Sequence, residues 1–426
     1  MEFQSICVIG LGYIGLPTAS MFATHGICVT GVDNNAEVVK SLEAGKVHIY
    51  EPGLKEVVDE AINRGNLKVS VEPVFADAFI IAVPTPFYGD KKADLSYVHA
   101  AAESIVKVLR KGNLVILEST SPPLTTVEHV LPIMEKSGLK AGKDFLLAYS
   151  PERVLPGQIL KELVENARVI GGIDKASAEA GRDLYKIIVK GEIILTDATT
   201  SEMVKLMENT YRDVNIAIAN EFSRLADRFG VDVWEAIQIA NRHPRVKILN
   251  PGPGVGGHCI SVDPWFFVEA APDISPLIRT ARNVNDSQPD FVVTTVNKAL
   301  GSLIHKKVAV LGLAFKPDVD DLRESPAIEV AHKIHLMGAS VMAFEPFKPD
   351  FKHEGINMVS TLSEAVNCAD AILLLVNHTQ FRMINAVELR DMTKAKVVID
   401  TVNGWNRGDF ETAGFRFVRL GDQKNI

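Results

Sequence analysis

The chain alternates short apolar runs with amphipathic helical stretches, and no other feature of the sequence constrains the fold as strongly. Near-continuous apolar strands separated by helices are typical of a parallel sheet covered by helices on both faces. The first half therefore predicts a doubly wound α/β domain. Its strand-like runs are Ser5–Gly10, Cys28–Asp33, Leu67–Val71, Ala78–Val83, Leu114–Glu118, Phe145–Ser150, Arg168–Gly171 and Glu192–Leu195.

The middle of the chain shows a helical period instead. From Thr199 to Phe229 apolar residues recur at steps of three and four, which predicts one long helix with an apolar stripe. A helix of this length often forms the spine between domains and a dimer surface. Further helices are predicted at Val233–Ala240 and Pro276–Leu303. The stripe consists of Met203, Leu206, Met207, Val214, Ile218, Phe222, Leu225 and Phe229.

Strand–helix alternation resumes at Lys307. The predicted fold class is therefore α/β, with two Rossmann-like doubly wound domains joined by a central helical domain. We expect the domains to span residues 1–198, 199–304 and 305–426. The later strands are predicted at Val308–Leu311, Ser340–Phe344, Ala371–Val376 and Val397–Asp400.

Composition narrows the range of functions. A net charge of −8 over 426 residues argues against a nucleic-acid binder, because no basic excess is present to displace counterions. No apolar run approaches the length of a membrane span, so no membrane association is expected. The four cysteines lack paired spacing, which indicates neither a metal site nor a disulfide framework. We expect a reducing, cytoplasmic environment.

A glycine motif opens the first α/β unit. Gly10, Gly12 and Gly15 form GxGxxG between a strand and a helix, where glycines allow a tight turn and the close approach of a pyrophosphate. The next strand ends in Asp33, an acid placed to bind the adenine-ribose diol. The acid favours NAD over a 2′-phosphorylated cofactor. The alternative is a glycine-rich turn in an unrelated α/β fold.

Two later strand ends are further candidates for cofactor contact. The segments Val83–Pro86 and Glu118–Thr120 lie where ligands of such sheets bind, at the carboxyl ends of strands. Either segment is alternatively a simple strand-to-loop transition.

The stretch from Asn250 to Asp263 is the most informative in the chain. Its glycines and prolines predict a shaped loop, and Gly256-Gly257 would let the backbone approach a ligand just before Cys259. A lone cysteine is more often a small buried hydrophobe. We apply that interpretation to the other three cysteines, and we interpret Cys259 as a nucleophile. The other three are Cys7, Cys28 and Cys368.

A thiol has a specific use in a dehydrogenase. One hydride transfer converts an alcohol to an aldehyde, and thiolate addition then makes the aldehyde carbon tetrahedral. Loss of a second hydride gives a thioester, which water hydrolyses. The thiolate needs a cationic or hydrogen-bonding neighbour.

Such neighbours are predicted on the long helix. Lys205 and Asn209 share a face that Arg212 continues, although a solvated polar face is the usual alternative. Glu152 follows a strand and is either a general base or water-positioning group, or a surface acid. In the second α/β domain Ala314 replaces the second motif glycine, which argues against a second full dinucleotide site. Its Lys316 and Arg323 are predicted to grip a diphosphate, or else to form a surface ion-pair cluster.

Together these motifs resemble the UDP-glucose/UDP-mannose dehydrogenase family from end to end. That resemblance implies an NAD domain, a central dimerisation domain and a UDP-binding domain, in a homodimer that pairs further in some cases. The matching segments are Val8–Gly15, Val83–Pro86, Glu118–Pro122, Ser150–Gly157, Ser201–Asn209, Gly254–Asp263 and Gly312–Ser325.

The resemblance also implies residue roles. Cys259 is the nucleophile, supported by Asp263; Lys205 and Asn209 stabilise the oxyanion, and Thr120 with Glu152 orders the hydrolytic water. The NAD site is implied to comprise Gly10, Gly12, Tyr13, Ile14, Gly15, Asp33, Thr85 and Thr120. The substrate site is implied to comprise Arg153, Val154, Leu155, Lys205, Asn209, Arg212, Gly256, Lys316 and Arg323, with His243 and Arg245 reaching the neighbouring subunit's substrate.

A finer match favours the branch of the family that oxidises UDP-N-acetylhexosamines, with N-acetyl-D-mannosamine ahead of N-acetylglucosamine and glucose. The segments that carry it include His48–Pro52, Pro151–Gly157, Asn209–Asn215 and Asn241–Val246. One departure is that family members often carry a basic residue just after the strand that ends at Asp400, where this chain has Thr401-Val402-Asn403-Gly404. Two other classes remain open: a two-electron dehydrogenase in which Cys259 only packs, and a non-catalytic nucleotide-sugar sensor.

Overall fold

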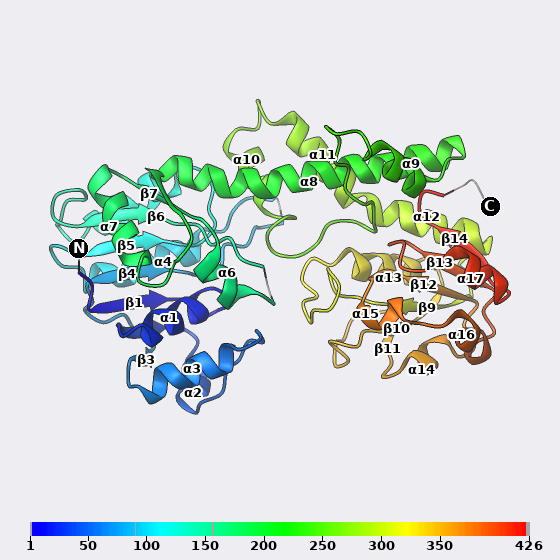
Figure 1. Cartoon of the computed structure of the whole chain (residues 1–426), viewed down its shortest axis with the longest axis horizontal. Helices are drawn as coiled ribbons and strands as arrows, with labels where there is room; N and C mark the ends of the chain where they lie inside the picture. Colours follow the sequence, from blue (N-terminus) through cyan, green and yellow to red (C-terminus); the bar gives the residue numbers. More distant parts are fainter. Residues whose placement is uncertain (1, 90, 156, 423–426) are drawn as a thin grey trace. The chain divides into compact units, whose positions relative to one another are not determined.

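The structure is a computed structural model that describes residues 2–89, 91–155 and 157–422. By backbone proximity the chain divides into two compact units (Figure 1). The first holds the residues up to Glu208 together with Phe266–Pro272, and the second holds Asn209–Trp265 and the residues from Asp273 onward. The predicted central helical segment is thus shared between the units, and the three-domain boundaries remain a prediction.

The first unit is built on an eight-stranded sheet with the order β3-β2-β1-β4-β5-β6-β7-β8. Its strands are β1 (Ser5–Ile9), β2 (Cys28–Val32), β3 (Leu67–Ser70), β4 (Ala78–Ile81), β5 (Leu114–Leu117), β6 (Leu146–Tyr149), β7 (Arg168–Gly172) and β8 (Ile193–Asp197). Its helices are α1 (Gly15–Thr24), α2 (Ala36–Glu43), α3 (Leu54–Asn63), α4 (Ser96–Val106), the π-helix η1 (Thr125–Val130), α5 (Leu131–Glu135), α6 (Ile159–Glu165) and α7 (Lys175–Tyr185).

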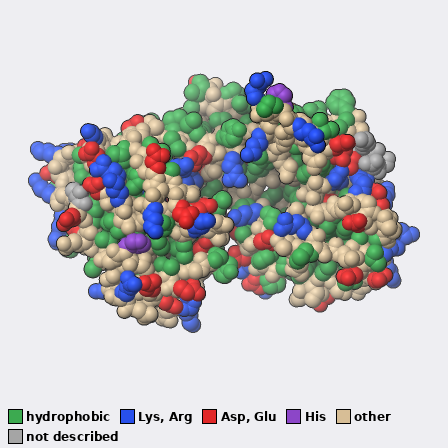
Figure 2. All heavy atoms as spheres, viewed as in Figure 1, with side chains coloured by type: hydrophobic (Ala, Val, Ile, Leu, Met, Phe, Trp, Pro, Cys, Tyr) green, Lys and Arg blue, Asp and Glu red, His purple; other side chains and the backbone are tan. Residues whose placement is uncertain are grey.

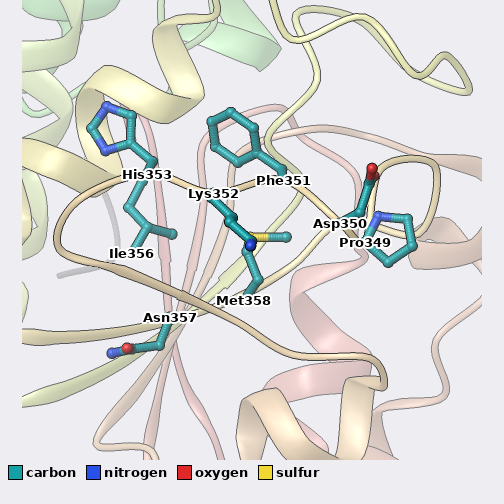
Figure 3. Close-up of a pocket in the computed structure, with 8 residues that line it drawn as sticks. All are labelled: Pro349, Asp350, Phe351, Lys352, His353, Ile356, Asn357 and Met358. Atoms are coloured by element: carbon teal, nitrogen blue, oxygen red, sulfur yellow. The ribbon is translucent and has the colours of Figure 1, made fainter.

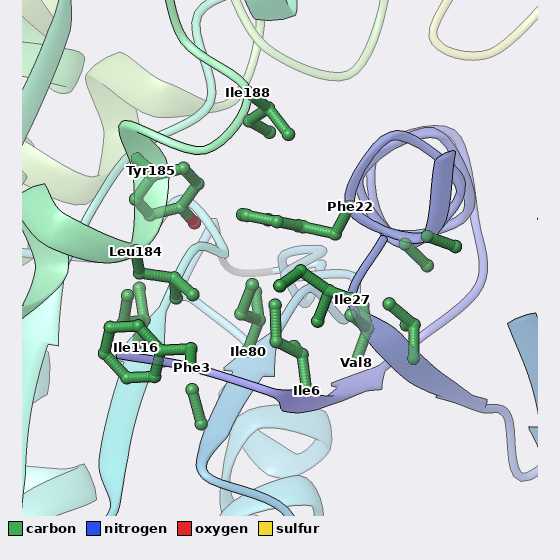
Figure 4. Close-up of a cluster of buried hydrophobic side chains, with 14 of the residues drawn as sticks. Phe3, Ile6, Val8, Phe22, Ile27, Ile80, Ile116, Leu184, Tyr185 and Ile188 are labelled. Atoms are coloured by element: carbon green, nitrogen blue, oxygen red, sulfur yellow. The ribbon is translucent and has the colours of Figure 1, made fainter. Parts of the chain in front are cut away.

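Both faces of this sheet are buried. In β1, Ile6 and Val8 enter one hydrophobic cluster and Cys7 and Ile9 enter the other, as the two-residue period of a strand requires. Figure 4 shows the first cluster, in which Val8 lies among residues from α1 and α7. The predicted doubly wound architecture is confirmed.

One strand departs from the predicted parallel arrangement. β7 pairs with β6 in the antiparallel sense, with Ala148 opposite Gly172 and Tyr149 opposite Gly171. β8 then runs parallel to β7. An antiparallel strand begins at the sheet edge where its parallel neighbours end, so Arg168 lies at the carboxyl edge of β5 and β6. The expectation of an all-parallel sheet was wrong at this point.

The second unit contains a six-stranded parallel sheet with the order β11-β10-β9-β12-β13-β14. Its strands are β9 (Lys307–Leu311), β10 (Ser340–Phe344), β11 (Ile356–Met358), β12 (Ala371–Leu374), β13 (Val397–Asp400) and β14 (Arg416–Arg419). Its shorter helices are α9 (Val233–Ala240), α11 (Pro276–Asp286), α12 (Gln288–Leu300), α13 (Pro326–Leu336), α14 (Leu362–Val366), α15 (Thr379–Arg382), α16 (Ala386–Met392) and α17 (Arg407–Thr412).

Two helices continue from one unit into the other along the chain. The first is α8 (Ala198–Phe229), in which the boundary between the units lies between Glu208 and Asn209. The second is α10 (Asp263–Ala270), in which the boundary follows Trp265. The long predicted helix is therefore confirmed. The apolar stripe on α8 is largely uncovered, because Ile218, Phe222 and Leu225 are all exposed.

Sequence reasoning missed three features of the second unit. The predicted helix Pro276–Leu303 breaks at Ser287, and Pro289 then occupies the first turn of α12, where its missing N–H costs nothing. Strands β11 and β14 were not predicted, because one has only three residues and the other carries arginine at both ends.

No helix in the described part of the chain combines the length and apolar character needed to cross a bilayer.

Candidate active site

The glycine turn after β1 has the geometry of a dinucleotide site. Gly10 has φ +94°, and a Cβ there would lie 2.5 Å from the Ala82 carbonyl oxygen. A Cβ on Gly15 would lie 1.8 Å from the Gly10 oxygen. Gly12, in contrast, has nothing within 4 Å of an added Cβ. Two glycines are thus required by packing, and the third leaves open space where a pyrophosphate can approach the backbone.

Asp33 completes this turn. Its Oδ2 accepts a hydrogen bond from the Leu11 N–H at 3.1 Å, and its Oδ1 accepts one from Asn35 at 2.9 Å. The residue follows β2, which pairs with β1 one strand away from the reversal of strand order between β1 and β4, and it is only half-buried. Both carboxylate oxygens retain accepting capacity for a ribose diol. These residues fit NAD.

The second unit has a similar arrangement of a strand-end acid and a turn, but its acid is buried. Glu345 follows β10, and its Oε2 accepts from the N–H groups of Leu313 at 2.7 Å and Ala314 at 3.0 Å. The same oxygen lies 3.0 Å from His378 Nε2, and both side chains are fully buried. The acid is therefore inaccessible to a ribose, which is a physical reason against a second dinucleotide site.

Two predicted cofactor residues meet at the switch point of the first sheet. The Thr85 hydroxyl, after β4, donates to the Thr120 carbonyl oxygen, after β5, at 2.6 Å. Ser119 Oγ donates to the Val83 oxygen at 2.7 Å. The two strand-end segments are therefore tied together at the edge that also carries Gly10.

Glu152 and Glu118 belong to a buried ionic cluster that sequence reasoning missed. Arg168 Nη1 donates to Glu152 Oε2 at 2.9 Å, its Nη2 binds Glu118, and its Nε donates to Ser150 Oγ at 2.9 Å. The Tyr185 hydroxyl donates to Glu118 at 2.8 Å. Burial raises the pKa of Glu118 to about 7, against the opposing effect of Arg168.

These contacts correct two expectations. Glu118 points into the cluster and not toward a cofactor, and Glu152 is buried, so the surface-acid interpretation was wrong. The available signal was a pair of charged residues, Glu118 and Arg168, at the ends of otherwise apolar strands. Charged side chains in such runs are rarely buried without a partner.

The loop before α10 presents the predicted nucleophile. Cys259 is exposed, and its carbonyl oxygen accepts from the Asp263 N–H at 2.8 Å. The Gly257 N–H donates to the Arg323 oxygen at 3.1 Å. A Cβ on Gly256 would lie 2.4 Å from the Glu324 oxygen, and one on Gly257 would meet the Phe315 ring at 2.8 Å. These glycines therefore permit close packing against the 315–324 loop, which is a different reason from the predicted approach to a ligand.

Two predicted partners of the thiol are in direct contact. Asn209 Nδ2 donates to Asp263 Oδ2 at 2.6 Å, and the two side chains are 8% and 2% exposed. Lys205, one helical turn earlier, is 9% exposed. The solvated-face alternative was thus wrong for Lys205 and Asn209, although Arg212 is exposed.

The remaining predicted substrate residues differ in their exposure and in their contacts. Arg153 pairs with Glu208 at 2.8 Å, and Arg323 forms a two-pronged ion pair with Asp321 in which Nε donates at 2.8 Å. Lys316 Nζ lies 5.7 Å from the Phe315 ring centroid. The alternative of an ion-pair cluster therefore describes Arg323 in this structure. Three of the predicted residues are exposed: His243, Arg245 and Leu155. Three are half-buried: Val154, Tyr13 and Ile14. Asn403 accepts a hydrogen bond from Arg419.

The other cysteines only partly match their predicted role. Cys7 is a buried residue of β1, in the hydrophobic cluster that also contains Ile9. Burial raises the pKa of its thiol to about 11, so it is a packing residue. Cys28 and Cys368 were expected to be buried, but both are exposed. Cys28 is the first residue of β2, and Cys368 lies just beyond α14 with φ +59°, so neither side chain reaches the core.

One surface hollow lies in the second unit, away from the predicted site residues. A hollow of about 420 Å³ is lined by eight residues between Pro349 and Met358, beside β11 (Figure 3). None of these eight is a predicted site residue. Figure 2 shows acidic and basic side chains interspersed over the visible surface, as expected for a chain with a small net negative charge.

Comparison with known proteins places this geometry in a family. Residues 4–189, 199–287 and 309–407 match, in turn, the NAD-binding, central and UDP-binding domains of the UDP-glucose/GDP-mannose dehydrogenase family. The chain is 51% identical to UDP-N-acetyl-D-mannosamine dehydrogenase of Methanocaldococcus jannaschii, over 99% of this chain and 97% of that protein. It is 47% identical to NDP-N-acetyl-D-galactosaminuronic acid dehydrogenase of Ralstonia nicotianae, over 95% and 97%.

A solved structure agrees with the sequence comparison. UDP-D-ManNAc dehydrogenase from Pyrococcus horikoshii superposes with a TM-score of 0.92 at 42% identity, covering 99% of this chain and all of that one. The matches to the three family domains follow one another in the same order as the motifs described above. The chain belongs to the UDP-glucose/GDP-mannose dehydrogenase family.

Proposed function

We propose that this protein oxidises the C6 primary alcohol of UDP-N-acetyl-D-mannosamine to a carboxylate. For each sugar two NAD⁺ are reduced, one water supplies its oxygen, and three protons are released. The observation that carries the proposal is the exposed Cys259 on a loop whose Asp263 is hydrogen-bonded to Asn209. The sugar is the one named for the relative that is 51% identical over 99% of the chain.

The first unit holds the cofactor. Gly12 would leave room for the pyrophosphate, Asp33 would accept from the ribose, and Thr85 and Thr120 would line the site from the neighbouring strand ends. NAD⁺ supplies the hydride acceptor in both oxidations. Tyr13 and Ile14 complete the turn, with Ile14 at the N-cap of α1, where unpaired N–H groups favour phosphate.

The chemistry on the sugar falls to the chain's own side chains. After the first oxidation Cys259 adds to the aldehyde carbon, and Lys205 and Asn209 stabilise the oxyanion that forms. After the second oxidation a thioester remains. Water, ordered by Thr120 and Glu152, then attacks the acyl carbon, the C–S bond breaks, and sulfur leaves as the thiolate.

Substrate binding is assigned to other side chains. The UDP portion is assigned to Lys316 and Arg323, and the sugar to Arg153, Val154, Leu155, Arg212 and Gly256.

The stoichiometry of the reaction tests this function. The protein is incubated with NAD⁺ and one of four UDP-sugars, carrying N-acetylmannosamine, N-acetylglucosamine, N-acetylgalactosamine or glucose, and NADH and uronate are both quantified. We expect two NADH per uronate, with the manno sugar fastest. A ratio near one would exclude the covalent scheme. A faster reaction with the galacto sugar would favour the activity of the Ralstonia relative.

We further propose that a second copy of this chain covers α8. Tyr211, Ile218, Phe222, Leu225 and Phe229 follow steps of seven, four, three and four, which places them along one seam of the helix. All five are exposed, Tyr211 and Phe229 by 70% each. A seam of this kind is self-complementary across a two-fold axis. His243 and Arg245, exposed on the loop after α9, are the residues proposed to reach the partner's substrate.

Charge placed on the seam tests the dimer. We expect Ile218→Glu combined with Leu225→Glu to halve the molar mass measured by light scattering, because two buried carboxylates per chain are not tolerated at such an interface. Leu336→Glu is the matched control, since Leu336 is also an exposed apolar residue but lies at the end of α13. A wild-type mass equal to one chain would contradict the proposal.

A further inference from the structure

Arg168 lies beside Glu152, the residue proposed to order the hydrolytic water. Extending the antiparallel register of β6 and β7 places Arg168 opposite Glu152, because Ala148 faces Gly172 and Tyr149 faces Gly171. A parallel β7 would have started at the far edge of the sheet. The single reversal of strand direction therefore brings a guanidinium to the edge that carries Thr120 and Glu152.

The contacts fix the Glu152 carboxylate at both oxygens. Oε2 accepts from Arg168 Nη1 at 2.9 Å, and Oε1 accepts from the Arg153 backbone N–H at 2.6 Å. Each oxygen keeps a second lone pair for a further donor. The side chain thus has one orientation, with accepting capacity left for a water molecule.

Arg168 is itself immobilised. Its Nε donates to Ser150 Oγ, its guanidinium lies 3.7 Å from the centroid of the Tyr185 ring, and the side chain is 5% exposed. Figure 4 shows Tyr185 facing Phe22 within the core, and the two ring centroids are 5.8 Å apart. The guanidinium therefore packs against Tyr185, which belongs to a hydrophobic core cluster of the first unit.

Glu118 leaves the positive charge of Arg168 available to Glu152. Burial raises the pKa of Glu118 to about 7, and its Oε2 has no hydrogen-bond partner among the described residues. Two carboxylates and one guanidinium in a buried cluster favour retention of a proton on one acid. Glu118, the fully buried member of the pair, is the acid whose pKa is raised.

We propose that Arg168 is a positioning residue for thioester hydrolysis, acting by holding Glu152 in the orientation that orders the attacking water. This inference rests on the proposed function. In the step concerned, the water oxygen bonds to the acyl carbon, the C–S bond breaks with its electron pair leaving on sulfur, two protons are released to solvent, and nothing is oxidised or reduced. Both hydride transfers precede it, so they do not depend on Arg168.

Arg168→Lys tests the proposal. Lysine keeps the charge but lacks the planar fork that binds Glu152, Glu118 and Ser150 together. We expect hydrolysis to slow by about a hundredfold, the typical effect of a small misplacement of a reacting group. Rapid mixing with UDP-sugar and NAD⁺ should then show a burst approaching two NADH per site. Intact-protein mass spectrometry should show the uronyl thioester accumulating on Cys259.

Arg282→Lys is the matched control. Arg282 is also buried, at 1% exposed, and its Nη1 binds Asp213 at 2.5 Å in the second unit. Both variants are expected to lower the melting temperature, since each disturbs a buried ion pair. Only Arg168→Lys should accumulate the thioester. Equal behaviour of the two variants would overturn the proposal.

Three further outcomes are decisive. If Arg168→Lys fails to fold, Ser150→Ala removes one anchor of the guanidinium more gently, and absence of the adduct in that variant would overturn the proposal. If the wild-type protein yields only one NADH per sugar, the proposed function itself fails. If it yields two and Arg168→Lys matches the control, only the inference about Arg168 fails.

Discussion

Replacing Cys259 by serine is expected to abolish uronate formation, with a fall on the order of a thousandfold or more. A serine hydroxyl is almost entirely protonated at neutral pH, so it does not add to the aldehyde as a thiolate does. The second oxidation then lacks its tetrahedral substrate. Binding of NAD and of the UDP-sugar should be largely retained, because Cys259 is exposed and its loop is held by Gly257 and Asp263.

The measurement compares uronate yield, NADH yield and bound ligand in wild-type and variant protein. Cys28→Ser is the matched control, since Cys28 is also exposed but begins β2. We expect this control to keep wild-type activity. Undiminished uronate formation by Cys259→Ser would refute the nucleophile and return the protein to the class of two-electron dehydrogenases.

Substitution of Gly15 by alanine is expected to have the largest effect on stability. The new Cβ would lie 1.8 Å from the Gly10 carbonyl oxygen, a backbone atom that cannot rotate away. Overpacking in a core typically costs 1–3 kcal/mol and sometimes more, so we expect a loss of about 3 kcal/mol. For a unit of roughly 200 residues this lowers the melting temperature by about 6–12 °C.

Gly12→Ala separates folding from cofactor binding at the same turn. Its Cβ meets nothing within 4 Å, so the free energy of unfolding without cofactor should stay within about 0.5 kcal/mol of the wild-type value. The methyl group nevertheless occupies the space proposed for the pyrophosphate. We expect NAD to raise the melting temperature of the wild type but not of this variant. A full NAD-dependent shift in Gly12→Ala would refute the placement of the cofactor.

Local patterns in the sequence were sufficient for most of the architecture. Alternating apolar periods predicted both sheets and the helix α8, and GxGxxG with Asp33 predicted the cofactor turn. These features arise from residues within about thirty positions of one another, where periodicity and turn chemistry act directly. The break at Ser287 was missed because the apolar pattern continues across it, although Pro289 was a visible signal.

What the tertiary structure alone decided is the environment of each candidate side chain. No local pattern states that β7 runs antiparallel to β6, and this direction is what pairs Arg168 with Glu152. In the same way, Asp33 remains accessible whereas Glu345, in the matching position, is closed off by His378 from a distant segment. Strand direction and burial depend on contacts between residues far apart in the chain, so the sequence by itself determined the chemistry available, and only the folded chain decided which groups meet.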